Sequence, residues 1–207
     1  MIAENADLHR AQRSFRQVLD AFARPGEVRA IEPDDADDAR PASFEGSLCA
    51  LARLFVDQAV TFAVEDAESD AASRYLASET HARRTSGDLA DFVIVPGRAD
   101  AQLACDAVAC AKPGTPASPE LGATVLLGCA RIAQGDADNP GMRSVAVSGP
   151  GVKDVNRFCV DRVEWAAARE ARGDEFPCGI DLVLVAPDGA VVAIPRTSAV
   201  VVEGEVR

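Results

Sequence analysis

Two apolar segments near the end of the chain carry the clearest pattern of hydrophobic and polar positions. Valine, isoleucine and leucine are frequent in residues 176–186 and 190–197, and a Pro187-Asp188-Gly189 turn separates the two segments. Apolar runs on either side of an Asp-Gly turn predict a β-hairpin. Because the runs do not alternate strictly with polar residues, we expect both faces of this hairpin to be buried.

An acidic and a basic residue are expected to meet at one end of this hairpin. If Asp188 and Gly189 form a two-residue turn, counting back along both strands places Asp181 opposite Arg196. Pro195 has no N–H to donate to the sheet, so Arg196 is expected where the second strand leaves it. The pair is either purely structural, because a buried charge needs a partner, or part of a ligand or partner site.

The rest of the chain alternates between helical and extended patterns. Apolar spacings of three and four predict helices over residues 8–22, with Asp7 as a candidate N-cap, and over 48–55, 66–79, 99–110 and 154–172. Short apolar or β-branched runs predict strands over 27–31, 59–64, 92–95, 123–130 and 144–147, and residues 199–202 are expected to extend the hairpin. This alternation favours one α/β domain over residues 1–207 with a mixed sheet.

Composition narrows the classes of function. A net charge of −12 argues against binding to nucleic acid or to an anionic membrane surface. The six cysteines include no C-x-x-C pair, which suggests neither a disulfide framework nor a zinc site, and we expect them to be small buried residues of a reducing compartment. The sequence shows no apolar leader and no 18-residue apolar run, so we expect a cytoplasmic protein without a membrane span.

Familiar catalytic patterns are missing from the sequence. His9 and His81 are the histidines of the chain, so a metal centre is not expected. Neither Lys112 nor Lys153 stands in an apolar pattern that would lower its pKa, which argues against a pyridoxal phosphate Schiff base. From the residues alone, the chain suits an assembly subunit better than a self-contained enzyme.

Two weaker signals remain. Ser148-Gly149-Pro150-Gly151 follows one predicted strand and precedes a predicted helix, a placement that can aim backbone N–H groups at a phosphate. However, Pro150 removes one donor, and such turns are common without a ligand. Glu120 precedes the strand predicted at 123–130 and is either a functional carboxylate or an ordinary turn residue.

Several short blocks resemble a known family in the same order. The blocks are 11–16 with Arg24-Pro25-Gly26, 114–124, Ser148-Gly149-Pro150-Gly151, Phe176-Pro177 with 179–182, and 193–197. They are similar to PhnH, the H subunit of the bacterial carbon–phosphorus lyase core complex. The resemblance implies a three-layer α/β/α fold with a mixed sheet, similar to pyridoxal-phosphate-dependent transferases but without that cofactor or its lysine.

The resemblance also implies partners and a reaction. Members of the family form homodimers and join subunits G, I and J. With G, I and L, the H subunit is required to form α-D-ribose 1-methylphosphonate 5-triphosphate from ATP and methylphosphonate, with release of adenine. The catalytic part of that reaction is usually placed on subunit I, so the resemblance brings no catalytic residue to this chain.

Four residues are therefore candidates for contacts with a ligand or a partner: Asp181, Arg196, Thr197 and Glu120. Ser148, Gly149 and Gly151 are candidates for a phosphate loop. The alternative function is a self-sufficient enzyme acting on a small molecule, with Arg196 as an anion clamp and Asp181 or Glu120 as a base. No cofactor is expected in either case.

Overall fold

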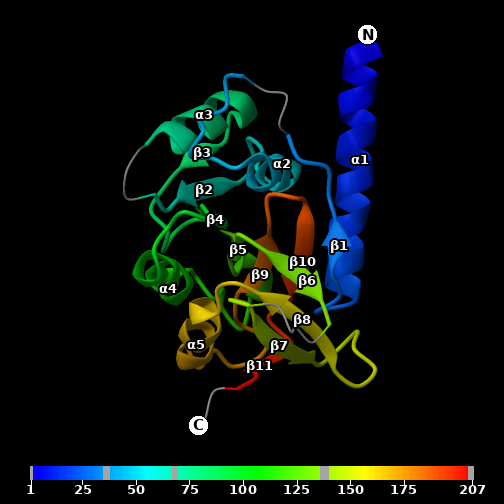
Figure 1. The fold of residues 1–207 in the computed structure, drawn as a ribbon. Helices are drawn as coiled ribbons and strands as arrows, with labels where there is room; N and C mark the ends of the chain where they lie inside the picture. Colours follow the sequence, from blue (N-terminus) through cyan, green and yellow to red (C-terminus); the bar gives the residue numbers. More distant parts are fainter. Residues whose placement is uncertain (1, 35–37, 67–69, 136–139, 205–207) are drawn as a thin grey trace.

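The computed structural model describes residues 2–34, 38–66, 70–135 and 140–204, and its main feature is a seven-stranded mixed sheet (Figure 1). In spatial order the strands are β1 (Arg29–Ala30), β10 (Ala190–Ile194), β9 (Asp181–Val185), β5 (Thr124–Gly128), β4 (Phe92–Val95), β2 (Thr61–Val64) and β3 (Arg83–Arg84). Strands β9, β5, β4, β2 and β3 run parallel to their neighbours in this order, whereas β10 is antiparallel to both β9 and β1. The prediction of an α/β fold with a mixed sheet is confirmed.

The predicted hairpin is present and is buried on both faces, but its register differs by one residue from the expected one. Val185 pairs with Val191 and Leu182 with Ile194, so continuing the ladder places Asp181 opposite Pro195 rather than Arg196. The turn contains three residues, because the N–H of Ala186 bonds to the carbonyl of Ala190 and Gly189 adopts a left-handed φ of 88°. A type I turn followed by one left-handed residue is the usual three-residue connection.

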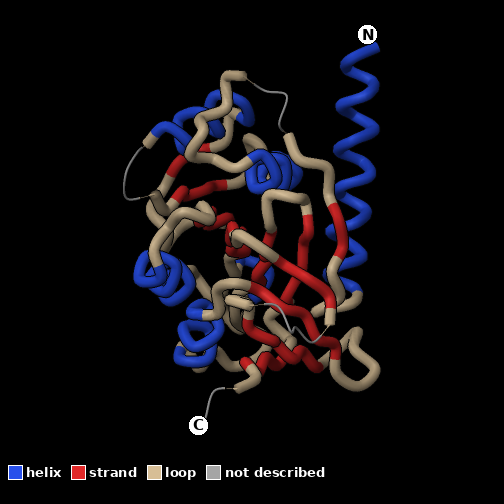
Figure 2. Tube along the Cα trace, in the orientation of Figure 1, coloured by secondary structure: helices blue, strands red, loops and turns tan. Residues whose placement is uncertain are grey.

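Three helices cover one face of this sheet (Figure 2). They are α1 (Ile2–Ala23), α2 (Gly46–Phe55) and α3 (Ala71–Thr80). Helix α1 buries Val18 and Ala21 against sheet residues such as Val183, as its apolar spacing predicts. The helix begins at Ile2, so Asp7 does not cap it.

The opposite face is covered by α4 (Ala101–Cys110), α5 (Glu164–Ala171) and a second, four-stranded antiparallel sheet. The order in this sheet is β11 (Ala199–Val202), β7 (Arg143–Ser148), β8 (Asn156–Val160) and β6 (Ile132–Gln134). Its strands β7, β8 and β11 lie in the lower part of the molecule in Figure 1, with β11 lowest. This layer contains a sheet as well as helices, which differs from a plain α/β/α sandwich.

The second sheet contradicts three expectations from the sequence. Residues 144–147 belong to it rather than to the main sheet, and β11 pairs with β7 instead of extending the hairpin. The helix predicted over 154–172 is wrong in its first half, because 156–160 form β8. The apolar run Phe158-Cys159-Val160 is compatible with a helix or with a buried strand. It forms a strand because β8 pairs with β6 on one side and β7 on the other.

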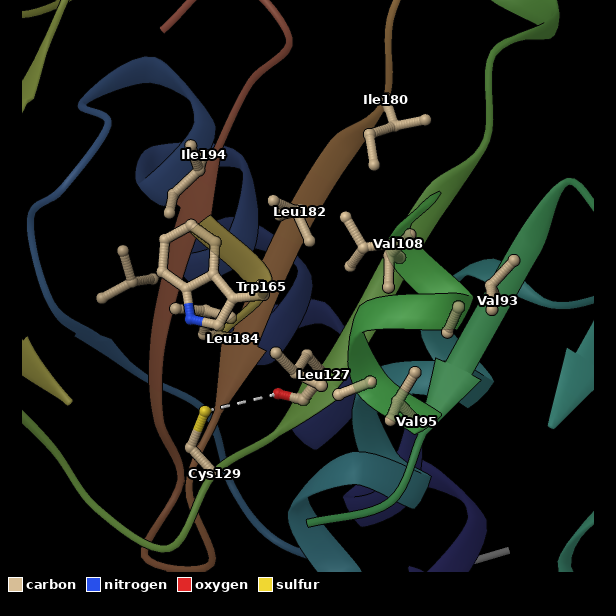
Figure 3. Packing of buried hydrophobic residues seen from close by; sticks show 14 of the residues in the cluster. Val93, Val95, Val108, Leu127, Cys129, Trp165, Ile180, Leu182, Leu184 and Ile194 are labelled. Atoms are coloured by element: carbon tan, nitrogen blue, oxygen red, sulfur yellow. Dashed lines mark hydrogen bonds between the residues drawn. The ribbon is translucent and has the colours of Figure 1, made fainter. Parts of the chain in front are cut away.

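Trp165 is central to the core beneath the second sheet (Figure 3). Its indole is fully buried in the same cluster as Leu182, Leu184 and Ile194, and its Nε1 donates to the carbonyl of Arg162 at 2.9 Å. The hydrogen bond satisfies the polar atom that this large side chain would otherwise bury without a partner. Trp165 thereby anchors α5 in the core.

The cysteines follow the expected burial only in part. Cys49, Cys129 and Cys159 are buried, Cys105 and Cys178 are half-buried, and Cys110 is exposed; none of these six described residues forms a disulfide. Burial raises the pKa of the Cys49 thiol to about 11, so this group behaves as a small apolar side chain.

One predicted helix extends over residues that the structure does not describe. Residues 67–69 of the segment 66–79 lie outside the described residues. Within the described part of the chain, no helix combines the length and the apolar character that crossing a bilayer requires.

The buried sheet predicts a large difference between two leucines. Leu126 on β5 is fully buried, whereas Leu89 is 62% exposed. We expect Leu126→Ala to lower the free energy of unfolding by about 2–5 kcal/mol, since it removes buried surface and leaves a cavity. Leu89→Ala should change it by less than about 0.5 kcal/mol. Urea unfolding followed by circular dichroism measures both, and equal losses would contradict the arrangement of the sheet.

Candidate functional site at the Asp181–Arg196 pair

Asp181 and Arg196 meet although they are not opposite each other in the hairpin. Arg196 donates from Nη2 to Asp181 Oδ2 at 2.6 Å and from Nε to Oδ1 at 3.3 Å. The backbone N–H of Arg196 also donates to Oδ1, at 2.7 Å. Strand β10 ends at Ile194, and beyond Pro195 the chain turns so that both the backbone and the side chain of Arg196 reach the carboxylate. The predicted contact is therefore present, but through a different geometry.

The pair is largely shielded from solvent, with side-chain exposures of 16% for Arg196 and 18% for Asp181. The hydrogen bonds to Asp181 raise the pKa of the Arg196 guanidinium, and this effect exceeds that of burial, which lowers it. Two parallel N–H···O bonds between a guanidinium and a carboxylate form a strong, directional interaction. The pair therefore fixes the amino-terminal end of β9 to the segment that follows β10.

A loop from elsewhere in the chain completes the surroundings of Arg196. Its Nη1 donates to the carbonyl of Pro119, in the short 3-10 turn Pro119–Leu121. Gly122 follows this turn, and a Cβ there would collide with the carbonyl oxygen of Gly179 and lie 2.7 Å from Arg196 Nη1. Gly122 is thus explained by close packing against this guanidinium and against the backbone of Gly179.

The other two candidates from this region have looser positions. Glu120 is exposed, and its charge adds to the raised pKa of Arg196 without forming an ion pair with it. Thr197 is also exposed. The structure thus brings Asp181 and Arg196 into direct contact, with Glu120 and Thr197 at the surface beside them.

The Ser148-Gly149-Pro150-Gly151 segment connects β7 to β8 as a hairpin turn. No helix follows it, so the N–H groups of a helix N-terminus, on which the phosphate interpretation depended, are not there. The segment packs instead on the end of α1: a Cβ on Gly151 would lie 3.0 Å from Cδ of Pro25. Asn156, at the start of β8, donates from Nδ2 to the carbonyl of Pro25 at 2.8 Å and ties the same segment after α1 to the second sheet.

A cavity of about 240 Å³ lies next to the ion pair. Its walls include Arg196, Cys178, Gly179 and two residues that sequence reasoning did not single out, Arg169 and Ser198. Arg169 follows three consecutive alanines and precedes Glu170, and nothing in this local sequence separates it from an ordinary surface arginine. Arg169 contacts the turn after β10, and that contact arises only from the tertiary fold.

A second polar cluster lies at the opposite end of the parallel strands, their carboxyl end, where α/β sheets usually bind ligands. Arg162 is buried there and donates to Glu164 Oε1 at 2.6 Å and to the carbonyls of Gly97 and Gly128, both at 3.4 Å. Glu45 accepts from the N–H of Gly97 through Oε1 at 3.0 Å, while its Oε2 is buried without a hydrogen bond. Sequence reasoning missed this cluster. No group of three or more His, Cys, Asp or Glu side chains in the described ranges is placed to hold a metal ion.

The ion pair predicts a specific loss of stability. We expect Arg196→Ala to lower the free energy of unfolding by about 3 kcal/mol, because the partly buried Asp181 would lose both side-chain hydrogen bonds and keep only the one from the backbone N–H of residue 196. Arg83 is exposed on the edge strand β3, so Arg83→Ala is the matched control and should cost less than about 0.5 kcal/mol. Equal effects in chemical denaturation would show that the pair contributes nothing.

Gly122→Ala tests the packing around the same guanidinium. The added methyl group overfills the contact, and we expect a loss of about 1–3 kcal/mol. Removing Arg196 relieves part of this overlap, so Gly122→Ala should cost less in an Arg196→Ala background than in the native chain. Strictly additive losses in a double-mutant cycle would refute the contact.

Comparison with known proteins confirms the family that the sequence blocks resemble. A family model described as bacterial phosphonate metabolism protein (PhnH) matches residues 3–201. HtxG of Stutzerimonas stutzeri, a proposed C-P lyase subunit protein, is 29% identical over 199 residues, which cover 94% of this chain and 88% of that protein. Because the family match extends over nearly all of the sequence, this chain belongs to the PhnH family of bacterial phosphonate metabolism proteins.

Proposed function

We propose that this chain is the H-type subunit of a carbon–phosphorus lyase assembly. With subunits G, I and L it would be required to form α-D-ribose 1-methylphosphonate 5-triphosphate from ATP and methylphosphonate, releasing adenine, and it would join G, I and J in the core complex. The observation that carries the proposal is the family match over residues 3–201. The name of the relative HtxG as a proposed C-P lyase subunit supports it.

The finer features of the family form part of this proposal. We infer a homodimeric, cytoplasmic protein whose fold is related to pyridoxal-phosphate-dependent transferases but has lost the cofactor's lysine. The surroundings of both lysines support that loss. Lys112 Nζ forms an ion pair with Asp91 Oδ1 at 2.5 Å, and Lys153 is exposed.

An apolar set of surface residues supports a role in assembly. Leu89, Leu121 and Phe176 are 62%, 54% and 78% exposed. They lie in the segments that enter β4, β5 and β9, which are neighbours in the sheet. All three therefore belong to the side of the molecule where these parallel strands begin, which is also the side that carries Asp181. Exposed apolar side chains gathered at one edge are typical of a surface that a partner covers. We call these three residues the apolar edge.

The geometry gives less support to the alternative of a self-sufficient enzyme with Arg196 as an anion clamp. All three nitrogens of the Arg196 guanidinium already donate to Asp181 or to Pro119. Asp181, the base in that alternative, accepts two side-chain hydrogen bonds and one backbone hydrogen bond from Arg196, and these occupy its oxygens. Turnover of ATP and methylphosphonate by the isolated chain would favour the alternative over the proposal.

The assembly role predicts the behaviour of two surface variants. We expect Phe176→Asp and Leu121→Asp to lower co-purification with subunit I at least tenfold, because each puts a charge into a surface that a partner buries. Ribosyl transfer by the assembly of G, H, I and L should fall in parallel. The thermal stability of the isolated chain should hardly change.

Val155→Asp is the matched control, since Val155 is 42% exposed in the β7–β8 turn, away from the apolar edge. It should co-purify normally. If the native chain does not co-purify with any partner when all subunits are co-expressed, the proposed function is wrong. If it does but the two edge variants still bind, the apolar edge is not the contact.

A further inference from the structure

Arg169 carries a positive charge that no carboxylate neutralises directly. Its Nη2 donates to three backbone carbonyls, those of Pro195 at 3.1 Å, Arg196 at 3.2 Å and Ser198 at 3.0 Å. Among the described residues, neither Nε nor Nη1 of Arg169 has a hydrogen-bond partner, and no acidic side chain forms an ion pair with it. A guanidinium remains protonated in proteins, so the charge persists.

The acids around Arg169 are already engaged elsewhere. Asp181 is held by Arg196. Asp174 accepts from Arg172 Nε at 2.6 Å. Glu170, at the rim of the cavity, is exposed and makes no ion pair with Arg169. Two of the three nearby cations are thus paired, and the third is left with carbonyl dipoles alone.

Burial makes this unpaired charge costly. Desolvation lowers the pKa of Arg169, and the more distant charges of Asp181 and Asp174 offset this only in part. Removing a charge from water without a counter-ion is unfavourable, and proteins normally supply a partner of opposite sign. A bound anion would supply that partner here.

Ser198 provides an independent sign of a missing ligand. It is only 5% exposed, and its Oγ is buried without any hydrogen-bond partner. Ser198 and Arg169 line the same cavity of about 240 Å³. Leaving a buried hydroxyl without a hydrogen bond is unfavourable, and such groups are rare in folded proteins.

We propose that this cavity binds a small tetrahedral oxyanion, a phosphate or phosphonate group, with Arg169 as its counter-ion and the Ser198 hydroxyl as a second donor. The planar guanidinium offers the two-pronged donor geometry that such oxygens accept. The volume is below the roughly 300–1,000 Å³ of sites for drug-sized ligands, so the cavity suits one such group rather than a whole nucleotide. Arg196 adds positive charge to the wall while Asp181 holds it in place.

The oxyanion site stands on the geometry alone. The narrower assignment of methylphosphonate as its occupant in the cell rests on the function proposed above. A binding measurement on the isolated full-length chain, without any partner subunit, distinguishes the presence of an oxyanion site from its preference for methylphosphonate.

The test is isothermal titration calorimetry of the chain with methylphosphonate, inorganic phosphate and sulfate at fixed ionic strength. We expect the native chain to bind methylphosphonate and phosphate, with exothermic, saturable heats. Arg169→Gln should weaken binding at least tenfold, as expected for loss of a charged donor, and Ser198→Ala should weaken it about threefold to tenfold. Arg83→Gln, at the exposed edge strand, should bind like the native chain.

Ser198→Ala keeps the test decisive if Arg169→Gln fails to fold, because it removes one unpartnered hydroxyl and leaves the three carbonyl contacts intact. Absence of binding by the native chain at millimolar ligand, or equal affinities in native chain and Ser198→Ala, would overturn the site. Equal affinities for phosphate, sulfate and methylphosphonate would support the oxyanion site and overturn its assignment to phosphonates. Failure here leaves the co-purification test of the proposed function unaffected.

Discussion

One partly buried ion pair fixes how the end of this chain is arranged. Asp181 is the first residue of β9 and Arg196 the second residue beyond β10, and their contact closes the hairpin at the end opposite its turn. The same guanidinium holds the carbonyl of Pro119, so it joins the hairpin to the segment that leads into β5. Three parts of the chain that are far apart in sequence thus converge on one side chain. The neighbouring cavity owes its shape to this convergence.

The sequence predicted the elements whose signal is local. The apolar runs on both sides of the Asp-Gly turn gave the hairpin, and the spacing around Val18 and Ala21 gave α1. The hairpin register was off by one because Gly189 forms part of a three-residue turn, and the turn length cannot be read from an Asp-Gly pair alone. Asp181 and Arg196 still meet, since the backbone turn at Pro195 compensates for the shift.

The errors have a common physical origin. Residues 156–160 have an apolar spacing that suits a helix or a short strand, and only pairing with β6 and β7 selects the strand. Arg169 was missed because its surroundings come from a distant part of the chain: the tertiary fold places the carbonyls of Pro195, Arg196 and Ser198 against it, and no acidic side chain among the described residues forms an ion pair with it. Long-range contacts of this kind cannot be predicted from the residues that adjoin 156–160 or Arg169 in the sequence. The family resemblance, in contrast, was accessible because its glycines stand at close packing contacts.

The chain changes sheets between β10 and β11, and this crossing has a consequence of its own. Residues 195–198 form the tether between the seven-stranded sheet and the four-stranded one, and the carbonyls that Arg169 grips belong to it. A displacement of the Arg169 guanidinium would therefore change the position of a segment that is continuous with both sheets. The tether thus couples the position of α5 to that of β11, the edge strand of the smaller sheet.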